Sequence, residues 1–164
     1  MIEGKVWTLG RDINTDSIMA GRYCSMQDRN EQVKHVLEDL DPTFAKTFPP
    51  GGVIVADENF GCGSSREIAP LILKVAGVAA VVASSFARIF YRNAINIGLP
   101  IFEAPSISGH FTQGQLIAID AETGKITNII TGEYFQVEPL PPFMQKIIKA
   151  GGLIAYASKQ LEQA

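Results

Sequence analysis

Hydrophobic and polar positions follow two different patterns along the chain of 164 residues. In its middle part, short apolar runs alternate with longer segments whose apolar residues recur every three or four positions, which is typical of strands followed by helices. The expected elements there are strands over 53–56, 79–83 and 100–102, and helices over 65–76 and 86–96. Such alternation predicts a parallel sheet with right-handed crossovers, the α/β core of the fold.

Beyond Gly114 the period changes to strict alternation in short segments separated by glycine-containing turns. This pattern predicts an antiparallel meander with strands over 116–120, 125–129 and 134–137. Before the core we expect a strand over 5–8 and a helix over 30–40, and after the meander we expect helices over 142–150 and 153–160. The predicted class is α/β, with a parallel βαβ core and an antiparallel strand meander.

The helix expected over 65–76 is amphipathic. Its residues Ile68, Leu71, Ile72 and Val75 follow the i, i+3, i+4, i+7 spacing, which predicts that this face contacts the sheet. The start of the helix then lies at the carboxyl ends of the strands, where open α/β sheets bind ligands.

Composition narrows the possible partners. The 46% hydrophobic content and the absence of low-complexity tracts predict one compact domain over 1–164. A net charge of −3 without a basic run argues against nucleic acid as a partner, and no segment has the 18 or so apolar residues that cross a bilayer. With no apolar signal core at the start, we expect a cytoplasmic protein with a small ligand and no membrane partner.

The chain contains two cysteines, Cys24 and Cys62. They are too few to supply the thiolates of an iron–sulfur cluster, so any such cluster must be carried by another chain, and no spacing predicts a metal site here. Cys62 lies in a glycine-rich turn, either as a reactive thiol or simply as a small residue that a tight turn tolerates.

The segment Gly61-Cys62-Gly63-Ser64-Ser65-Arg66-Glu67 carries the clearest candidate chemistry. Its glycines permit a sharp turn, and an arginine beside two hydroxyl groups at a helix start predicts a site for an anion such as a carboxylate. A structural alternative is a capping box, in which Ser64 and Glu67 only start the helix. The dinucleotide, P-loop and nucleophile-elbow patterns all fail, and a serine hydrolase would require His35 or His110 as its base.

Two further motifs contain charged residues. In the loop 12–16, Asp12 and Asp16 are either site carboxylates or ordinary turn caps. Arg88 and Arg92 share one helix face at i, i+4 spacing, which favours contact with solvent or a partner.

Three motifs in order, at 12–16, 59–67 and 85–93, carry a family resemblance. The chain resembles the small-subunit family of 3-isopropylmalate dehydratases, which is similar to the swivelling C-terminal domain of aconitase. The resemblance spans essentially the whole chain and implies a swivelling β/β/α domain, in agreement with the core and meander predicted above.

The resemblance implies a hydro-lyase that interconverts 2- and 3-isopropylmalate in leucine biosynthesis, active only with a large subunit that carries a [4Fe–4S] cluster. By the family pattern Ser64 is the base and Arg66 binds a substrate carboxylate. Ser65 and Gly63 provide further substrate contacts, and Asp16 orders the hydrogen bonds of the site.

The chain departs from the family pattern at two places. Ile68 stands where many relatives have histidine, and the loop Cys24-Ser25-Met26, which by resemblance selects the substrate, lacks the arginine of homoaconitase-like relatives. The substrate therefore stays open between isopropylmalate and the acids of homoaconitase or of a dimethylmalate- or citramalate-type dehydratase. A carboxylate-binding regulatory module is the alternative without catalysis.

Overall fold

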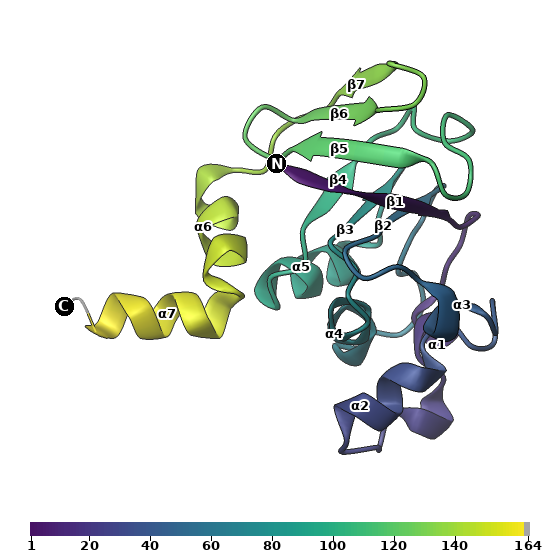
Figure 1. Ribbon diagram of the computed structural model, residues 1–164. Coiled ribbons are helices and arrows are strands. Elements are labelled where there is room, and N and C mark those ends of the chain that lie inside the picture. Colours follow the sequence, from purple (N-terminus) through teal and green to yellow (C-terminus); the bar gives the residue numbers. More distant parts are fainter. Residues whose placement is uncertain (163–164) are drawn as a thin grey trace.

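The computed structural model describes residues 1–162 of the chain. Seven strands form one mixed sheet in the order β4-β3-β2-β1-β5-β6-β7 (Figure 1). Their bounds are β1 Ile2–Thr8, β2 Val53–Ala56, β3 Ala80–Ala83, β4 Ile101–Glu103, β5 Leu116–Asp120, β6 Lys125–Asn128 and β7 Tyr134–Gln136. Strands β2, β3 and β4 are parallel and β5, β6 and β7 antiparallel, so the predicted core and meander are both confirmed.

Strand β1 joins the two halves of the sheet. Its first part, Ile2 to Lys5, pairs with β5 in the antiparallel sense, and its last part, Val6 to Thr8, pairs with β2 in the parallel sense. The predicted strand, 5–8, was therefore too short. The missing residues are extended because β5 supplies their backbone hydrogen bonds, a long-range partner that no local pattern indicates.

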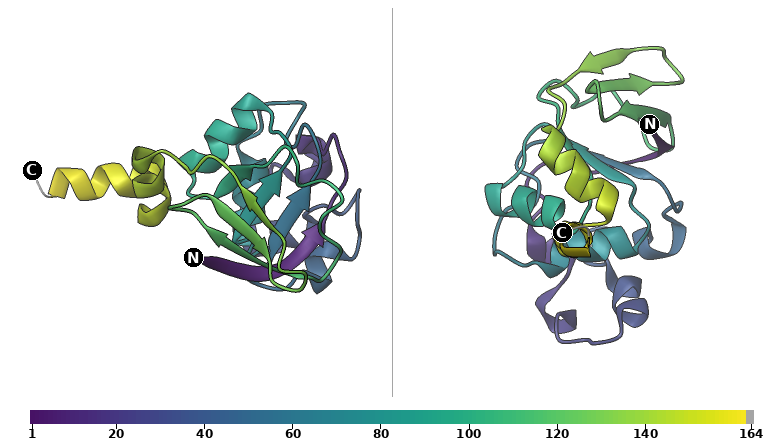
Figure 2. Two further views of the ribbon diagram at one scale, coloured as in Figure 1. Left: turned by 90° about the horizontal axis from the view of Figure 1, so that it is seen from above. Right: turned by 90° about the vertical axis from the view of Figure 1, so that its left-hand side faces the viewer.

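The helices cover the parallel half of the sheet and extend beyond it (Figures 1 and 2). Their bounds are α1 Thr15–Ile18, α2 Arg29–Gln32, α3 Phe44–Thr47, α4 Ile68–Val75, α5 Arg88–Asn96, α6 Pro142–Ala150 and α7 Leu153–Glu162, with 3-10 turns η1 Gly21–Tyr23 and η2 Val33–His35. Helix α7 projects from the body and has no buried residue. Among residues 1–162, no helix is long and apolar enough to cross a membrane.

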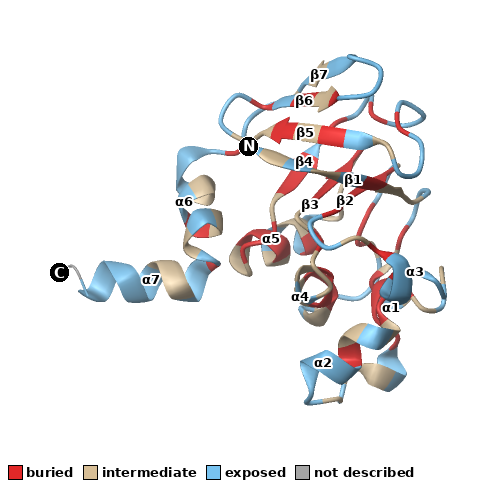
Figure 3. Cartoon of the chain, in the orientation of Figure 1, coloured by how far each residue is buried: buried red, intermediate tan, exposed pale blue. Residues whose placement is uncertain are grey.

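Burial follows the two kinds of strand (Figure 3). Every residue of β2 and β3 is buried, as expected for parallel strands covered on both faces. In β5 buried residues alternate with partly exposed or exposed ones, so only one face of the meander contacts the core.

The helix predicted over 30–40 was wrong. Helix α2 ends at Gln32, the turn η2 follows, and Leu37 adopts a positive φ of 55°. Leu37 is fully buried and its N–H donates to the carbonyl of Ile18, so packing against the segment of α1 overrides the local helical preference.

Helices α4 and α5 also begin later than predicted. Helix α4 starts at Ile68. Helix α5 starts at Arg88, because Phe86 forms a β-bridge with Phe60 and is therefore extended. The predicted buried face of α4 was partly wrong, since Val75 is 40% exposed and the buried residues are Ala69, Pro70, Ile72 and Leu73. Almost every position of α4 is apolar, so several faces fit the pattern equally and the tertiary neighbours select one.

Candidate functional site

The candidate site lies where the loop after β1 runs alongside the loop after β2. The two loops are joined by a ladder of hydrogen bonds. Its members are Asp12 N–H to Glu58 O (2.9 Å), Asn59 Nδ2 to Asp12 Oδ1 (2.9 Å), Gly61 N–H to Ile13 O (2.7 Å) and Thr15 N–H to Cys62 O (2.9 Å). This ladder brings the motif at 12–16 beside the motif at 59–67, as expected from the carboxyl-edge position.

Two glycines permit the turn between the ladder and Ser64. Gly61 has φ +80° and Gly63 φ +91°, a region that side chains disfavour. At Gly61 a Cβ atom would also lie 2.1 Å from the side chain of Phe90, so this position accepts no side chain without displacing α5. The turn is therefore shaped both by backbone conformation and by close packing.

Arg66 connects the residues predicted to form the site. Its Nε donates to Ser64 Oγ at 3.0 Å, and its Nη2 lies 2.8 Å from Asp16 Oδ1. Its Nη1 lies 3.1 Å from Cys24 Sγ. The guanidinium thus contacts a candidate base, a carboxylate and the proposed selectivity loop at the same time.

Ser64 does not form the capping box that the sequence allows. The residue before α4 is Glu67, no side chain caps the helix, and Ser64 lies three residues further back. Instead, Ser64 Oγ accepts from Arg66 and lies 3.2 Å from Thr15 Oγ1. The structural alternative for Ser64 is therefore wrong, and so is the prediction that Ser64 and Ser65 lie directly at the helix start.

The guanidinium of Arg66 rests on the turn η1. A Cβ at Gly21 would lie 3.2 Å from Arg66 Nη1, so the absence of a side chain at Gly21 leaves space for the guanidinium.

The neighbouring Arg22 donates from Nη1 to Asp39 Oδ2 at 2.9 Å, and this bond lowers the pKa of the Asp39 carboxyl. Sequence reasoning did not place Gly21 and Thr15 in the candidate site, because their contacts are with the distant Ser64–Arg66 segment.

The remaining predicted site residues are less directly involved. Ser65 and Ser25 are exposed, Met26 is half-buried, and within residues 1–162 no hydrogen bond joins their side chains to Ser64 or Arg66. Ile68 packs half-buried against the core. Burial raises the pKa of the Cys62 thiol, and the nearby Asp12 carboxylate raises it further, which disfavours the reactive-thiol interpretation.

No histidine is placed to act on Ser64. His35 stacks on Tyr23 and contacts Glu38, and His110 lies 2.9 Å from Glu133. A serine–histidine arrangement is therefore absent from the site among the described residues. In the same part of the chain, no group of three or more His, Cys, Asp or Glu side chains is arranged to hold a metal ion.

Arg66 and Asp16 form a partly exposed ion pair in the site. The side chain of Arg66 is 30% exposed, while that of Asp16 is 62% exposed. Arg66 is thus held on one side by Ser64 and Cys24, whereas its partner Asp16 is the more exposed member of the ion pair. On the exposed face of α5, Arg88 and Arg92 are exposed to solvent, consistent with their spacing.

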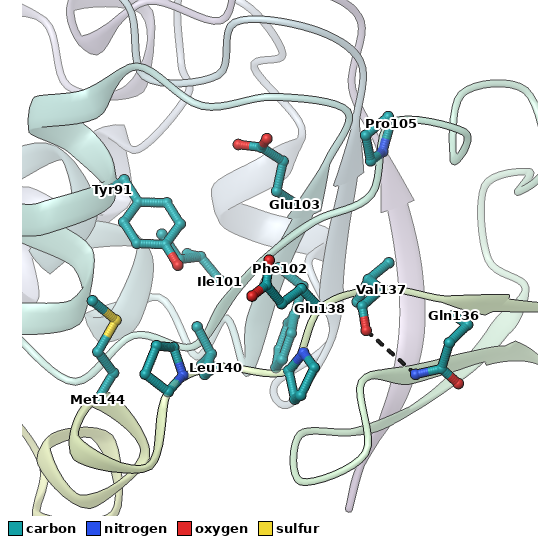
Figure 4. A pocket seen from close by; sticks show the side chains of 12 residues that line it. Tyr91, Ile101, Phe102, Glu103, Pro105, Gln136, Val137, Glu138, Leu140 and Met144 are labelled. Carbon is teal, nitrogen blue, oxygen red and sulfur yellow. Dashed lines mark hydrogen bonds between the residues drawn. The ribbon is translucent and has the colours of Figure 1, made fainter.

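A separate groove of about 530 Å³ lies between α5, β4 and the segment that leads into α6 (Figure 4). Tyr91, Glu103, Glu138 and Met144 are among its lining residues, and none of the predicted site residues belongs to it. Burial raises the pKa of Tyr91, and the carboxylates of Glu103 and Glu138 raise it further. The groove is therefore acidic, unlike the arginine-centred site.

Known proteins resemble this chain along nearly its whole length. The aconitase C-terminal domain family matches residues 12–105. A protein of Moorella thermoacetica named 3-isopropylmalate dehydratase small subunit is 54% identical, with 99% of this chain and 98% of the relative covered.

Two proteins of Methanocaldococcus jannaschii extend the comparison. A relative named isopropylmalate/citramalate isomerase small subunit is 46% identical over 100% of this chain and 98% of its own length. A crystal structure described as 3-isopropylmalate dehydratase (leuD) superposes with a TM-score of 0.92 at 40% identity, covering 99% of this chain and 96% of that one. From its fold, its motifs and these similarities, the chain belongs to the aconitase C-terminal domain family and, within it, to the 3-isopropylmalate dehydratase small subunits.

Proposed function

We propose that this chain is the small subunit of a cytoplasmic hydro-lyase that interconverts 2- and 3-isopropylmalate by removing and re-adding water. The names of its relatives support both the reaction and a large subunit as partner. The observation that carries the proposal is the Arg66 guanidinium, which holds Ser64 while facing an exposed carboxylate partner.

In this proposal Ser64 removes the proton α to a substrate carboxylate. A serine hydroxyl is a weak base, so it must act as an alkoxide, and the cationic Arg66 at 3.0 Å favours that form by charge attraction. The proton then forms a new O–H bond at Ser64 Oγ while its electron pair stays on the substrate carbon.

Arg66 and Asp16 then share the binding of substrate. A substrate carboxylate competes with Asp16 for Nη2 of Arg66, and the exposed Asp16 side chain moves aside to order water or the substrate hydroxyl. Gly63 and Ser65, in the same loop, supply contacts to the bound acid in this proposal.

In this proposal the [4Fe–4S] cluster is carried by the large subunit. The two thiols of the chain do not fit a cluster: Cys24 contacts Arg66, and Cys62 lies in the turn between Gly61 and Gly63. We therefore assign to this chain only proton transfer and carboxylate binding.

A second substrate has specific support. The relative from Methanocaldococcus jannaschii is named for both isopropylmalate and citramalate, which differ in the size of the alkyl group. Selectivity in this proposal resides in Cys24, Ser25 and Met26, the loop that reaches Arg66 through Cys24. Homoisocitrate and 2,3-dimethylmalate are the comparison substrates for homoaconitase- and dimethylmalate-type activity.

The test uses the chain co-expressed anaerobically with its large subunit. Ser64→Ala is expected to abolish alkene formation from 2-isopropylmalate while the complex stays intact, because the base is removed. Arg66→Lys is expected to lower turnover and raise KM, since an ammonium cannot replace the planar guanidinium.

Ser158→Ala, an exposed serine on α7, is the matched control and is expected to retain full activity. Normal turnover in Ser64→Ala would contradict the assignment of the base. An intact complex with no turnover on any of the four acids would instead favour a carboxylate-binding regulatory module.

A further inference from the structure

Ser64 has a hydrogen-bond partner outside the Ser-Ser-Arg motif. Thr15, the first residue of α1, is only 1% exposed, whereas Ser64 itself is exposed. A buried hydroxyl group normally satisfies its hydrogen bonds inside the protein, so its partners are informative.

The side-chain hydroxyl of Thr15 makes two hydrogen-bond contacts, and both are to Ser64. Its Oγ1 donates to the Ser64 carbonyl at 2.8 Å and lies 3.2 Å from Ser64 Oγ. Because the single hydroxyl proton of threonine is used on the carbonyl, the second contact has one consistent direction: Ser64 Oγ donates and Thr15 Oγ1 accepts.

The hydroxyl of Ser64 is therefore fixed from both sides. It accepts from Arg66 Nε at 3.0 Å and donates to Thr15, which sets its rotamer and leaves one lone pair for a substrate proton. Arg66 and Thr15 approach from different segments, and the N–H of Thr15 is itself held by the Cys62 carbonyl at 2.9 Å.

We propose that Thr15 is a positioning residue for Ser64 in the reaction proposed above, an inference that rests on Ser64 being the base. The Thr15 hydroxyl serves both protonation states of Ser64. It accepts from the neutral hydroxyl, and it turns its own proton from the Ser64 carbonyl to Oγ when Ser64 is an alkoxide. No proton is exchanged between the two residues, so Thr15 lowers the cost of the alkoxide without taking part in the transfer.

The test compares Thr15→Val and Thr15→Ser in the complex with the large subunit. Valine keeps the shape and removes the hydroxyl, so kcat is expected to fall by roughly ten- to a hundredfold, the effect of losing one hydrogen bond to a developing charge. KM is expected to change less than about twofold, because within residues 1–162 no hydrogen bond joins Thr15 to Arg66, the residue proposed to bind the substrate carboxylate. Serine restores the hydroxyl and is expected to recover most of kcat.

Two controls separate a structural effect from the proposed one. Thr47→Val removes a hydroxyl at the end of α3 that donates to the carbonyl of Thr43, the residue before this helix, and it is expected to leave kcat unchanged. Thermal unfolding of each variant identifies loss of folding, and Thr15→Ala replaces the valine variant if valine does not fold.

The kcat values of the Thr15 variants, compared with the turnover of Ser64→Ala, distinguish failure of this inference from failure of the proposed function. Normal kcat in Thr15→Val, or equal losses in the serine and valine variants, would overturn the role of Thr15. If Ser64→Ala retains turnover, the assignment of the base fails, and the inference about Thr15 fails with it. Inactive Ser64→Ala together with fully active Thr15→Val would overturn the role of Thr15 alone.

Discussion

At the scale of single residues, the site depends on side chains that have several partners. Arg66 contacts Ser64, Asp16 and Cys24 through different nitrogen atoms. Arginine suits this role because its planar fork offers donors in fixed directions, whereas lysine offers a single charged point. The residue types in the motif could be recognised from the sequence, but the partners of the guanidinium could not.

Gly61 gives a residue-scale prediction about stability. Gly61→Ala is expected to lower the free energy of unfolding by about 2–4 kcal/mol, because a positive φ and a clash with Phe90 act together. Gly51→Ala is the matched control, since Gly51 has φ +82° but open space around it, and a loss of only about 1–2 kcal/mol is expected. Urea unfolding of the small subunit measures both, and equal losses would show that the contact with Phe90 is unimportant.

At the scale of elements, one lysine of α4 donates hydrogen bonds to the C-terminal ends of two neighbouring helices, α5 and α6. Lys74, the only charged residue of α4, donates from Nζ to the carbonyl of Ile97 at 2.6 Å and to that of Gly151 at 3.1 Å. These carbonyls lie at the C-terminal ends of α5 and α6, where a cation also interacts favourably with the helix dipole. Lys74 therefore links α4 to the C-terminal ends of α5 and α6 through hydrogen bonds.

Lys74→Met tests this arrangement. Methionine keeps most of the apolar stem and removes the ammonium, so the free energy of unfolding is expected to fall by about 1–2 kcal/mol. Lys146→Met, at an exposed position on α6 where no hydrogen bond joins the side chain to another helix in the described part of the chain, is expected to change it by less than about 0.5 kcal/mol. Chemical denaturation distinguishes the two, and a Lys74 variant as stable as the control would contradict the capping role.

The elements themselves were predictable where local pattern and tertiary environment agree. The strands β2 and β5 begin and end where the apolar pattern predicts, and Gly151 ends α6 with φ 93°. The helix predicted over 30–40 does not form, because the chain buries Leu37 beside Ile18. This burial outweighs the cost of the positive φ that Leu37 adopts.

At the scale of the whole molecule, β1 makes the parallel core and the antiparallel meander one sheet. Since β1 pairs with β2 on one side and with β5 on the other, neither half keeps all its backbone hydrogen bonds if the other unfolds. We therefore propose that residues 1–164 fold as a single domain.

Cooperative unfolding tests this proposal. Trp7, the only tryptophan, lies in β1 with its ring centroid 5.2 Å from that of Phe44. Its fluorescence and the far-UV circular dichroism of the small subunit are expected to change in one coincident transition with increasing urea. Two separated transitions would show that the meander and the core unfold independently.

The sequence by itself determined the α/β class, the position of the glycine turn and the residue types of the candidate site, because these depend on local periodicity and on motifs of adjacent residues. Only the tertiary structure decided that Ser64 does not cap α4 and that its hydroxyl contacts Thr15. The contacts of Arg66 with Asp16 and Cys24 were likewise decided by the tertiary structure. Two of these contacts join residues far apart in the sequence, 42 positions for Cys24 and Arg66 and 49 for Thr15 and Ser64, and Asp16 is similarly distant from Arg66. Packing of the two loops, which no local pattern encodes, brings them within hydrogen-bonding distance.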